Sequence, residues 1–212
     1  MVSLSIQVHF ILGLPRHSSS NRSLLVPVPR TDIAIPEPIE LTFGGELHLL
    51  RPLTLDDADR LITFFRSHNE ETVRLRYGYF FREMTRGRAL ELVGVDQTRD
   101  LALGVGREKI PSEPVIDAIG RYFLLPDGAT AEMAFIVRET KRRLGMARAL
   151  LHALSHTARQ RGVVQLVAQV QRENRGMIAL FKSEGGSVKS VLGADVVDVM
   201  LPLQQTRRRG RS

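Results

Sequence analysis

Residues 131–147 read AEMAFIVRETKRRLGMA and form the most informative stretch of the chain. An apolar run that carries one acidic residue, Glu132, leads into a basic segment with one glycine, Gly145, and a helical pattern follows. A glycine-containing turn at a helix start directs unpaired backbone N–H groups and the positive end of the helix dipole toward an anion, usually a phosphate. The stretch therefore predicts a strand, an anion-binding turn and a helix in succession.

The residues on either side extend this pattern to a whole domain. The helix that begins near Met146 ends at Gly162, a C-terminal cap, and Asp127-Gly128 predicts a hairpin turn. Strands are predicted at 47–51, 101–105, 115–125, 132–138, 163–170, near 188 and at 196–201, and helices at 54–65, 70–76, 86–93 and 175–183. This order predicts a mixed α/β (α+β) fold, in which helices flank a central, twisted and mostly antiparallel sheet with one β–α–β unit.

Two helices show a clear apolar stripe. We expect one stripe at Leu55, Ala58, Leu61, Ile62 and Phe65, below an N-cap at Thr54. The helix after Gly145 has the apolar face Ala147, Leu150, Leu151, Leu154 and Ala158, and we expect its outer face to carry Arg148, His152, Ser155 and Arg159.

Composition excludes several classes of protein. The 212 residues include no cysteine, which rules out disulfides, a thiolate nucleophile and cysteine-ligated metal, and which fits a cytoplasmic location. No apolar run approaches the roughly 20 residues of a membrane span. The net charge is +7, but the arginines of the C-terminal tail supply four of these charges, so we expect no nucleic-acid partner.

The chain divides into three parts by composition. Residues 1–40 are rich in proline and serine, and we expect a disordered or loosely docked extension there. Regular patterning makes 41–203 the folded domain, and 204–212 a basic tail.

Each candidate site residue has a structural alternative. The turn 142–147 could bind a phosphate or could be a solvated basic loop that starts a helix. Glu132 could act as a general base, since partial burial raises the pKa of a carboxyl group, or could face outward on an alternating strand. Asn174 could present its amide to a cofactor or could cap a helix. His152 and His156 lie four apart, but without a third ligand we expect no metal.

Taken together, these motifs resemble the GNAT acetyltransferase superfamily. Its signature turn is [Gln/Arg]-x-x-Gly-x-[Gly/Ala], which Arg142-x-x-Gly145-x-Ala147 matches. The acidic strand at 131–135 is similar to the strand on which many members keep a general-base glutamate, and 173–177 resembles the segment after the fifth strand of the family. The resemblance covers about residues 45–202 and implies the GNAT fold.

The resemblance also implies roles for individual residues. Acetyl-CoA would be the donor, and Glu132 would take a proton from the attacking amine. The residues expected to bind this cofactor are Phe135, Ile136, Val137, Arg142, Arg143, Leu144, Gly145, Met146, Ala147 and Asn174. Many members have a tyrosine general acid where this chain has Phe181, and a Gly-Phe pair where it has Gly185-Gly186.

The front half is similar to the acetyltransferase domain of the bacterial Pat-type protein-lysine acetyltransferases. The segments that carry this likeness include 50–52, 71–77 and 99–103. It implies that the acceptor is a protein lysine, for instance on an acyl-CoA synthetase. Arg74, Arg76 and Arg82 would repel polyamines and aminoglycosides. The alternatives are an acetyltransferase for a small amine and a non-catalytic module that senses acyl-CoA.

Overall fold

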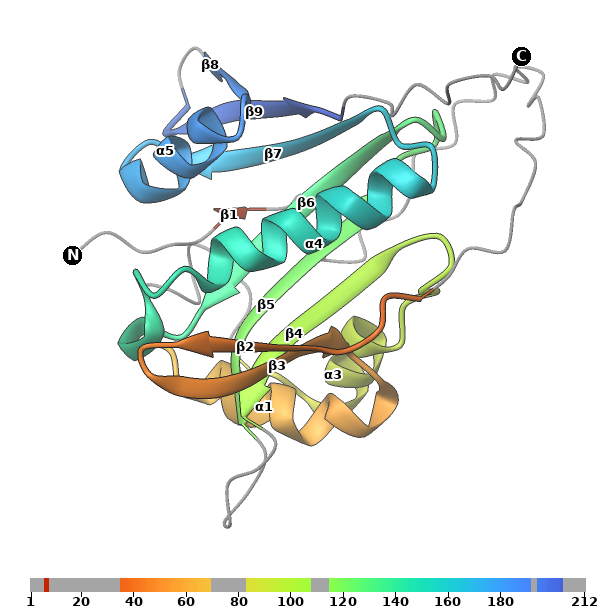
Figure 1. Ribbon diagram of the computed structural model, residues 1–212, viewed down its shortest axis with the longest axis vertical. Helices are drawn as coiled ribbons and strands as arrows, with labels where there is room; N and C mark the ends of the chain where they lie inside the picture. The colour runs from red at the N-terminus through yellow and green to blue at the C-terminus, as the bar shows by residue number, and fades with distance from the viewer. Residues whose placement is uncertain (1–5, 8–34, 70–82, 108–114, 192–193, 204–212) are drawn as a thin grey trace.

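One twisted sheet of nine strands forms the centre of the computed structural model, which describes residues 6–7, 35–69, 83–107, 115–191 and 194–203 (Figure 1). The strand order is β2-β3-β4-β5-β6-β7-β9-β8, and β1 pairs with β7. All neighbouring strands are antiparallel except β6 and β7, which are the parallel strands of a β–α–β unit. The mixed, mostly antiparallel fold predicted from the sequence is confirmed.

The strands are β1 (Ile6–Gln7), β2 (Ile39–Phe43), β3 (Glu46–Pro52), β4 (Leu101–Arg107), β5 (Val115–Leu124), β6 (Thr130–Val137), β7 (Gln165–Gln171), β8 (Ser187–Ser190) and β9 (Val196–Pro202). The α-helices are α1 (Ala58–Arg66), α3 (Arg86–Val93), α4 (Met146–Gln160) and α5 (Arg175–Ser183). Two short 3-10 helices, η1 (Leu55–Asp57) and η2 (Glu139–Lys141), precede α1 and α4. Among the described residues, no helix is both long and apolar enough to cross a membrane.

Helices cover both faces of the central strands. On β6, Met133 and Phe135 belong to the core beneath α4, whereas Ala134 and Ile136 belong to the core formed with α1 and α3 (Figure 1). Successive side chains of a strand point to opposite faces, so an apolar run such as this one is what a doubly covered strand requires. Seven of the eight residues of β6 are buried, and Glu132 is the exception.

Some packing details differ from the sequence prediction. Leu55 is 59% exposed because it lies in η1, ahead of the helix, and Phe64 takes its place in the core at 1% exposure. Ser155, expected on the outer face of α4, is 8% exposed. Strands β1 and β2 were not predicted, and β2 begins at Ile39, so the sheet starts before the expected boundary at 40. The helix predicted at 70–76 lies outside the described residues.

Candidate active site

The parallel strands β6 and β7 separate after three residue pairs. Their register joins Thr130 with Gln165, Ala131 with Leu166 and Glu132 with Val167. Beyond Glu132, β6 continues to Val137 along β5 only, while β7 continues along β9. The two strands therefore enclose a wedge, which we call the β6–β7 wedge. Its apex is at Glu132, and it opens toward the end of β6.

The edge of β6 that borders this wedge has no paired strand among the described residues. In an antiparallel strand, alternate residues direct their N–H and C=O groups away from the paired neighbour. Part of the backbone at Phe135, Ile136 and Val137 can therefore bond an extended ligand inside the wedge. Strand β1 lies inside the wedge, where it pairs with Val170 and Gln169 of β7 and also approaches β6, so that part of the wedge near its apex is already occupied.

Glu132 is half-buried at the apex of the wedge, next to Phe123 of β5 in the register. By strand alternation its side chain shares the α1 and α3 face with Ala134 and Ile136. A carboxylate that is partly shielded yet reachable by solvent meets the geometric need of a general base.

The turn after η2 lies at the open end of the wedge. Arg143 and Gly145 have φ values of 63° and 96°, so the backbone is left-handed on either side of Leu144. The first described bond within α4 runs from the Ala149 N–H to the Gly145 carbonyl at 3.0 Å, which leaves the preceding N–H groups without helical partners. Such a turn, ahead of a helix, forms an anion-binding concavity.

The β2–β3 hairpin supports this turn from one side. A Cβ built on Gly44 would lie 3.2 Å from Leu144 Cδ1, and one built on Gly145 would lie 3.8 Å from the Phe43 ring. At the end of η2 that adjoins the turn, Lys141 donates to Glu46 of β3, and this hydrogen bond lowers the pKa of the Glu46 carboxyl, as do the charges of Lys141 and Arg107.

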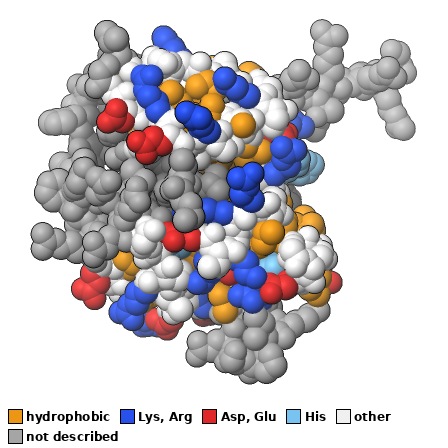
Figure 2. Space-filling model, turned by 90° about the vertical axis from the view of Figure 1, so that its left-hand side faces the viewer, with side chains coloured by type: hydrophobic (Ala, Val, Ile, Leu, Met, Phe, Trp, Pro, Cys, Tyr) orange, Lys and Arg blue, Asp and Glu red, His pale blue; other side chains and the backbone are white. Residues whose placement is uncertain are grey.

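Most of the basic side chains around the turn are already paired. Arg138 binds Asp117, Lys141 binds Glu46, Arg142 lies 3.7 Å from Glu139, and Arg148 lies 3.8 Å from Glu184. Within the described part of the chain, Arg143 is exposed and has no such partner. Figure 2 views this side of the molecule and shows basic side chains interspersed with acidic ones. Arg143 is therefore the cation most available to an incoming phosphate.

Two residues near the wedge have structural roles. Asn174 is 1% exposed and caps α5, with its Oδ1 accepting from the Met177 N–H at 3.2 Å. Phe181 is fully buried, and its ring centroid lies 6.4 Å from that of Phe135. The capping alternative for Asn174 is thus observed, and its contact with a cofactor stays a prediction. Of the two histidines that lie four apart on α4, His152 is exposed, and its Nε2 lies 2.9 Å from Glu184 Oε2.

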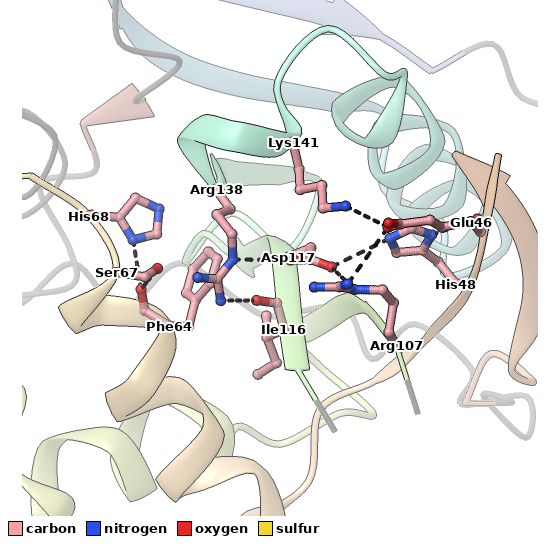
Figure 3. Close-up of polar contacts among 10 residues, drawn as sticks. All are labelled: Glu46, His48, Phe64, Ser67, His68, Arg107, Ile116, Asp117, Arg138 and Lys141. Carbon is pink, nitrogen blue, oxygen red and sulfur yellow. Dashed lines mark hydrogen bonds and ion pairs between the residues drawn. The ribbon is translucent and has the colours of Figure 1, made fainter. Parts of the chain in front are cut away.

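Sequence reasoning missed a charged cluster at the end of β6. Asp117, a fully buried acid on β5, contacts Arg107 and Arg138, and Glu46 extends the cluster to Lys141 (Figure 3). The sequence does contain a signal for this cluster, because an acidic residue inside the apolar run of β5 must have a buried partner. Which residues would supply it depended on the sheet order.

Comparison with known proteins places these elements in a family. A family model described as acetyltransferase (GNAT) domain matches residues 48–187. The GNAT domain of PAT from S. lividans is 25% identical, with a TM-score of 0.68 over 78% of this chain and 97% of that one.

Two further structures share the fold at lower identity. A cAMP-binding acyltransferase from Mycobacterium smegmatis is 22% identical, with a TM-score of 0.54 over 79% of this chain and 48% of that one. The PaiA N-acetyltransferase from Thermoplasma acidophilum, solved with coenzyme A, is 15% identical, with a TM-score of 0.56 over 73% of this chain and 98% of that one. Because the family model covers the wedge, the turn and most of the sheet, the chain belongs to the GNAT acetyltransferase family and is an N-acetyltransferase.

Proposed function

We propose that this protein transfers an acetyl group from acetyl-CoA to a protein lysine, by direct attack of the amine within a ternary complex. The observation that carries the proposal is the β6–β7 wedge, which has a half-buried carboxylate at its apex and an exposed, left-handed turn at its open end. A single extended ligand with a phosphate at one end and a thioester at the other can reach both ends of the wedge.

The donor would bind along the wedge. Its pyrophosphate would accept bonds from N–H groups between Arg143 and Ala147, with the Arg143 guanidinium as counter-ion. Its pantetheine arm would pair with the unpaired edge of β6 at residues 135–137. A β6 N–H group on the thioester oxygen would stabilise the negative charge that develops there during attack.

The reaction then needs a neutral amine. Glu132, directly or through one water, takes a proton from the ammonium, and the amine nitrogen attacks the thioester carbonyl carbon. The carbon–sulfur bond breaks, the acetyl group stays on nitrogen as an amide, and coenzyme A leaves as a thiolate. Phe181 supplies no proton, so the thiolate takes one from water.

The proposed acceptor is a lysine with acidic neighbours on another protein. It is supported by the likeness of the front half to Pat-type enzymes and by the basic residues Arg74, Arg76 and Arg82, which lie outside the described residues. An acceptor with several positive charges would be repelled by these arginines, whereas a lysine among acidic neighbours would be attracted.

A thiol-release assay on an acceptor panel tests the proposal. Acetyl-CoA is supplied with an acyl-CoA synthetase, a lysine peptide flanked by acidic residues, spermidine or an aminoglycoside. We expect salt-sensitive release with the protein or peptide and little with the polycations. Efficient turnover of spermidine, with kcat/KM above about 10⁴ M⁻¹s⁻¹, would make the enzyme a small-amine acetyltransferase. Donor binding without thiol release on any acceptor would instead indicate a sensor.

A further inference from the structure

A β-bulge in β5 directs the buried carboxylate of Asp117 toward Arg138, at the start of η2. On β4, Val105 and Gly106 are adjacent, but their partners on β5 are Ala118 and Ile116, so Asp117 between them has no partner. A Cβ on Gly106 would lie 2.3 Å from the Val115 carbonyl oxygen, so the close approach at the bulge requires glycine. Bulges redirect single side chains and are over-represented beside active sites.

Asp117 is fully buried and is held by cations from two neighbouring strand ends. Its Oδ1 accepts from Arg138 Nε at 3.0 Å and its Oδ2 accepts from Arg107 Nε at 2.9 Å (Figure 3). His48 Nε2 lies 3.4 Å from Oδ2. Two guanidinium groups therefore compensate one carboxylate that has lost its water.

Through Arg138, this carboxylate fixes the start of η2. The Arg138 backbone N–H donates to the Asp117 carbonyl at 2.8 Å, and its Nη2 donates to the Ile116 carbonyl at 2.8 Å. Arg138 is also the N-cap of η2, and its carbonyl accepts from the Lys141 N–H at 2.9 Å. Because Glu46 accepts a hydrogen bond from the Lys141 side chain, η2 is held by hydrogen bonds at both ends.

We propose that Asp117 is a positioning residue for the acetyl donor: by holding Arg138, it sets the direction in which the N–H groups of 143–147 point. Asp117 acts without touching the donor, because η2, which is held at both ends, is followed directly by Arg142 and the left-handed turn. The inference rests on the proposed function, since it assumes that this turn receives the donor pyrophosphate. Loss of the Asp117 charge would leave the turn free to move and would weaken donor binding, while the chemistry at Glu132 would be unaffected once the donor is bound.

The test compares Asp117→Asn with Asp57→Asn. Asp57 is also fully buried and also holds two arginines, Arg51 at 2.7 Å and Arg60 at 2.9 Å, but it joins β3 to α1, away from the turn. Acetyl-CoA affinity is measured by calorimetry, kcat and KM by thiol release, and Tm by thermal unfolding. We expect Asp117→Asn to raise Kd and donor KM about tenfold or more with kcat retained, the scale of one lost charged hydrogen bond.

Asp57→Asn should lower Tm and leave donor Kd unchanged. Equal effects of the two variants on Kd, or a lower Tm with unchanged Kd for Asp117→Asn, would overturn the positioning role. A wild-type protein that does not bind acetyl-CoA would instead overturn the proposed function itself.

A double-mutant cycle tests the route through Arg138. If Asp117 acts by holding that guanidinium, then Asp117→Asn adds no further loss of affinity in an Arg138→Gln background. Two independent losses would contradict the route. If Asp117→Asn does not fold, Arg138→Gln alone tests the inference, because the Arg138 side chain is 18% exposed and its replacement is less disruptive. An unchanged Kd of Arg138→Gln for acetyl-CoA would overturn the inference.

Discussion

At the scale of single residues, ion pairing decides which of the basic side chains can bind the donor. Arg138, Lys141 and Arg142 each have a carboxylate partner, whereas Arg143 is exposed and unpaired within the described part of the chain. A cation that must first leave a carboxylate contributes less to binding than one that is already available.

Replacing Arg143 should therefore weaken donor binding. We expect Arg143→Ala to raise the Kd for acetyl-CoA by about 10- to 100-fold, the range for a lost hydrogen bond to a charged group, with Tm unchanged. Arg143→Lys should retain much of the affinity, and raising the salt concentration should weaken the wild type more than the alanine variant. Calorimetric titration checks both points, and an Arg143→Ala protein with wild-type affinity would show that the phosphate is held elsewhere.

Some of the candidate site residues could be proposed from the sequence, and others could not. Glu132 and Gly145 could be proposed as candidates because each is conspicuous in its local pattern, one as an acid in an apolar strand and the other as a glycine at a helix start. Asp117 is equally conspicuous in β5, but its partners come from β4 and from the end of β6, which are distant in sequence. Only the sheet order brings them together.

At the scale of elements, the turn before α4 depends on left-handed backbone. Gly145 has φ 96°, and an added Cβ would meet the Phe43 ring at an ordinary contact distance of 3.8 Å, so backbone conformation limits substitution more than volume does. Gly145→Glu should abolish acetyl-CoA binding, because it strains the backbone and places negative charge where the pyrophosphate must lie. Gly128→Glu is the matched control, since Gly128 also has a positive φ, 69°, has nothing within 4 Å of an added Cβ and belongs to the β5–β6 hairpin. If calorimetry gives both variants the same affinity for acetyl-CoA, the donor does not bind at this turn.

Asp57, which pairs with Arg51 of β3 and Arg60 of α1, predicts that the stability of the fold depends on pH. Burial alone would raise the pKa of the Asp57 carboxyl, but hydrogen bonds from Arg51 and Thr54, with the charges of Arg51 and Arg60, lower it below the ordinary 3.8. A lowered pKa in the folded state means that Asp57 stabilises the fold when ionised, and that this contribution is lost as the pH falls through the folded-state pKa.

Asp57→Asn should accordingly reduce the free energy of unfolding by about 1–3 kcal/mol at neutral pH. The difference from the wild type should begin to shrink as the pH falls below the ordinary pKa of 3.8, where the carboxyl of the unfolded chain takes up a proton, and should disappear below the lowered pKa of the folded state. Urea unfolding of both proteins between pH 3 and pH 7 measures this difference. A difference that is independent of pH would show that the Asp57 charge does not contribute.

Helices and strongly apolar strands in the folded domain were predictable from sequence, whereas the short strands near the N-terminus were not. Helices α3 and α5 have the predicted bounds, and β4, β5 and β6 lie within two residues of theirs. Strand β2 was missed although its sequence, IELTF, alternates apolar and polar residues, because it lies next to the proline-rich segment that we assigned to the extension; four of its five residues are not buried, and it is held by its ladder with β3. The β6–β7 wedge could not be read from sequence either, since it reflects how far two strands stay paired.

At the scale of the whole molecule, the sheet and its two cores lie within residues 35–203, apart from β1. A truncated chain of residues 35–203 should therefore keep the Tm and the acetylation rate of the full chain, because what it loses has little apolar periodicity. It retains β2, which a cut at residue 41 would damage at Ile39 and Glu40. A lower Tm or a loss of donor binding would show that the N-terminal segment packs into the core, beginning with β1 on β7.

We propose that the β6–β7 wedge binds acetyl-CoA at its open end and that Glu132, at its apex, deprotonates the amine. The most direct measurement is the pre-steady-state rate of thiol release by Glu132→Gln, with acetyl-CoA affinity determined on the same protein. We predict that the rate falls by about 10²–10⁴-fold while the Kd for acetyl-CoA is unchanged, since the carboxylate acts on the amine and not on the donor. A variant that keeps wild-type release across pH 6–9 would show that the general base is not Glu132.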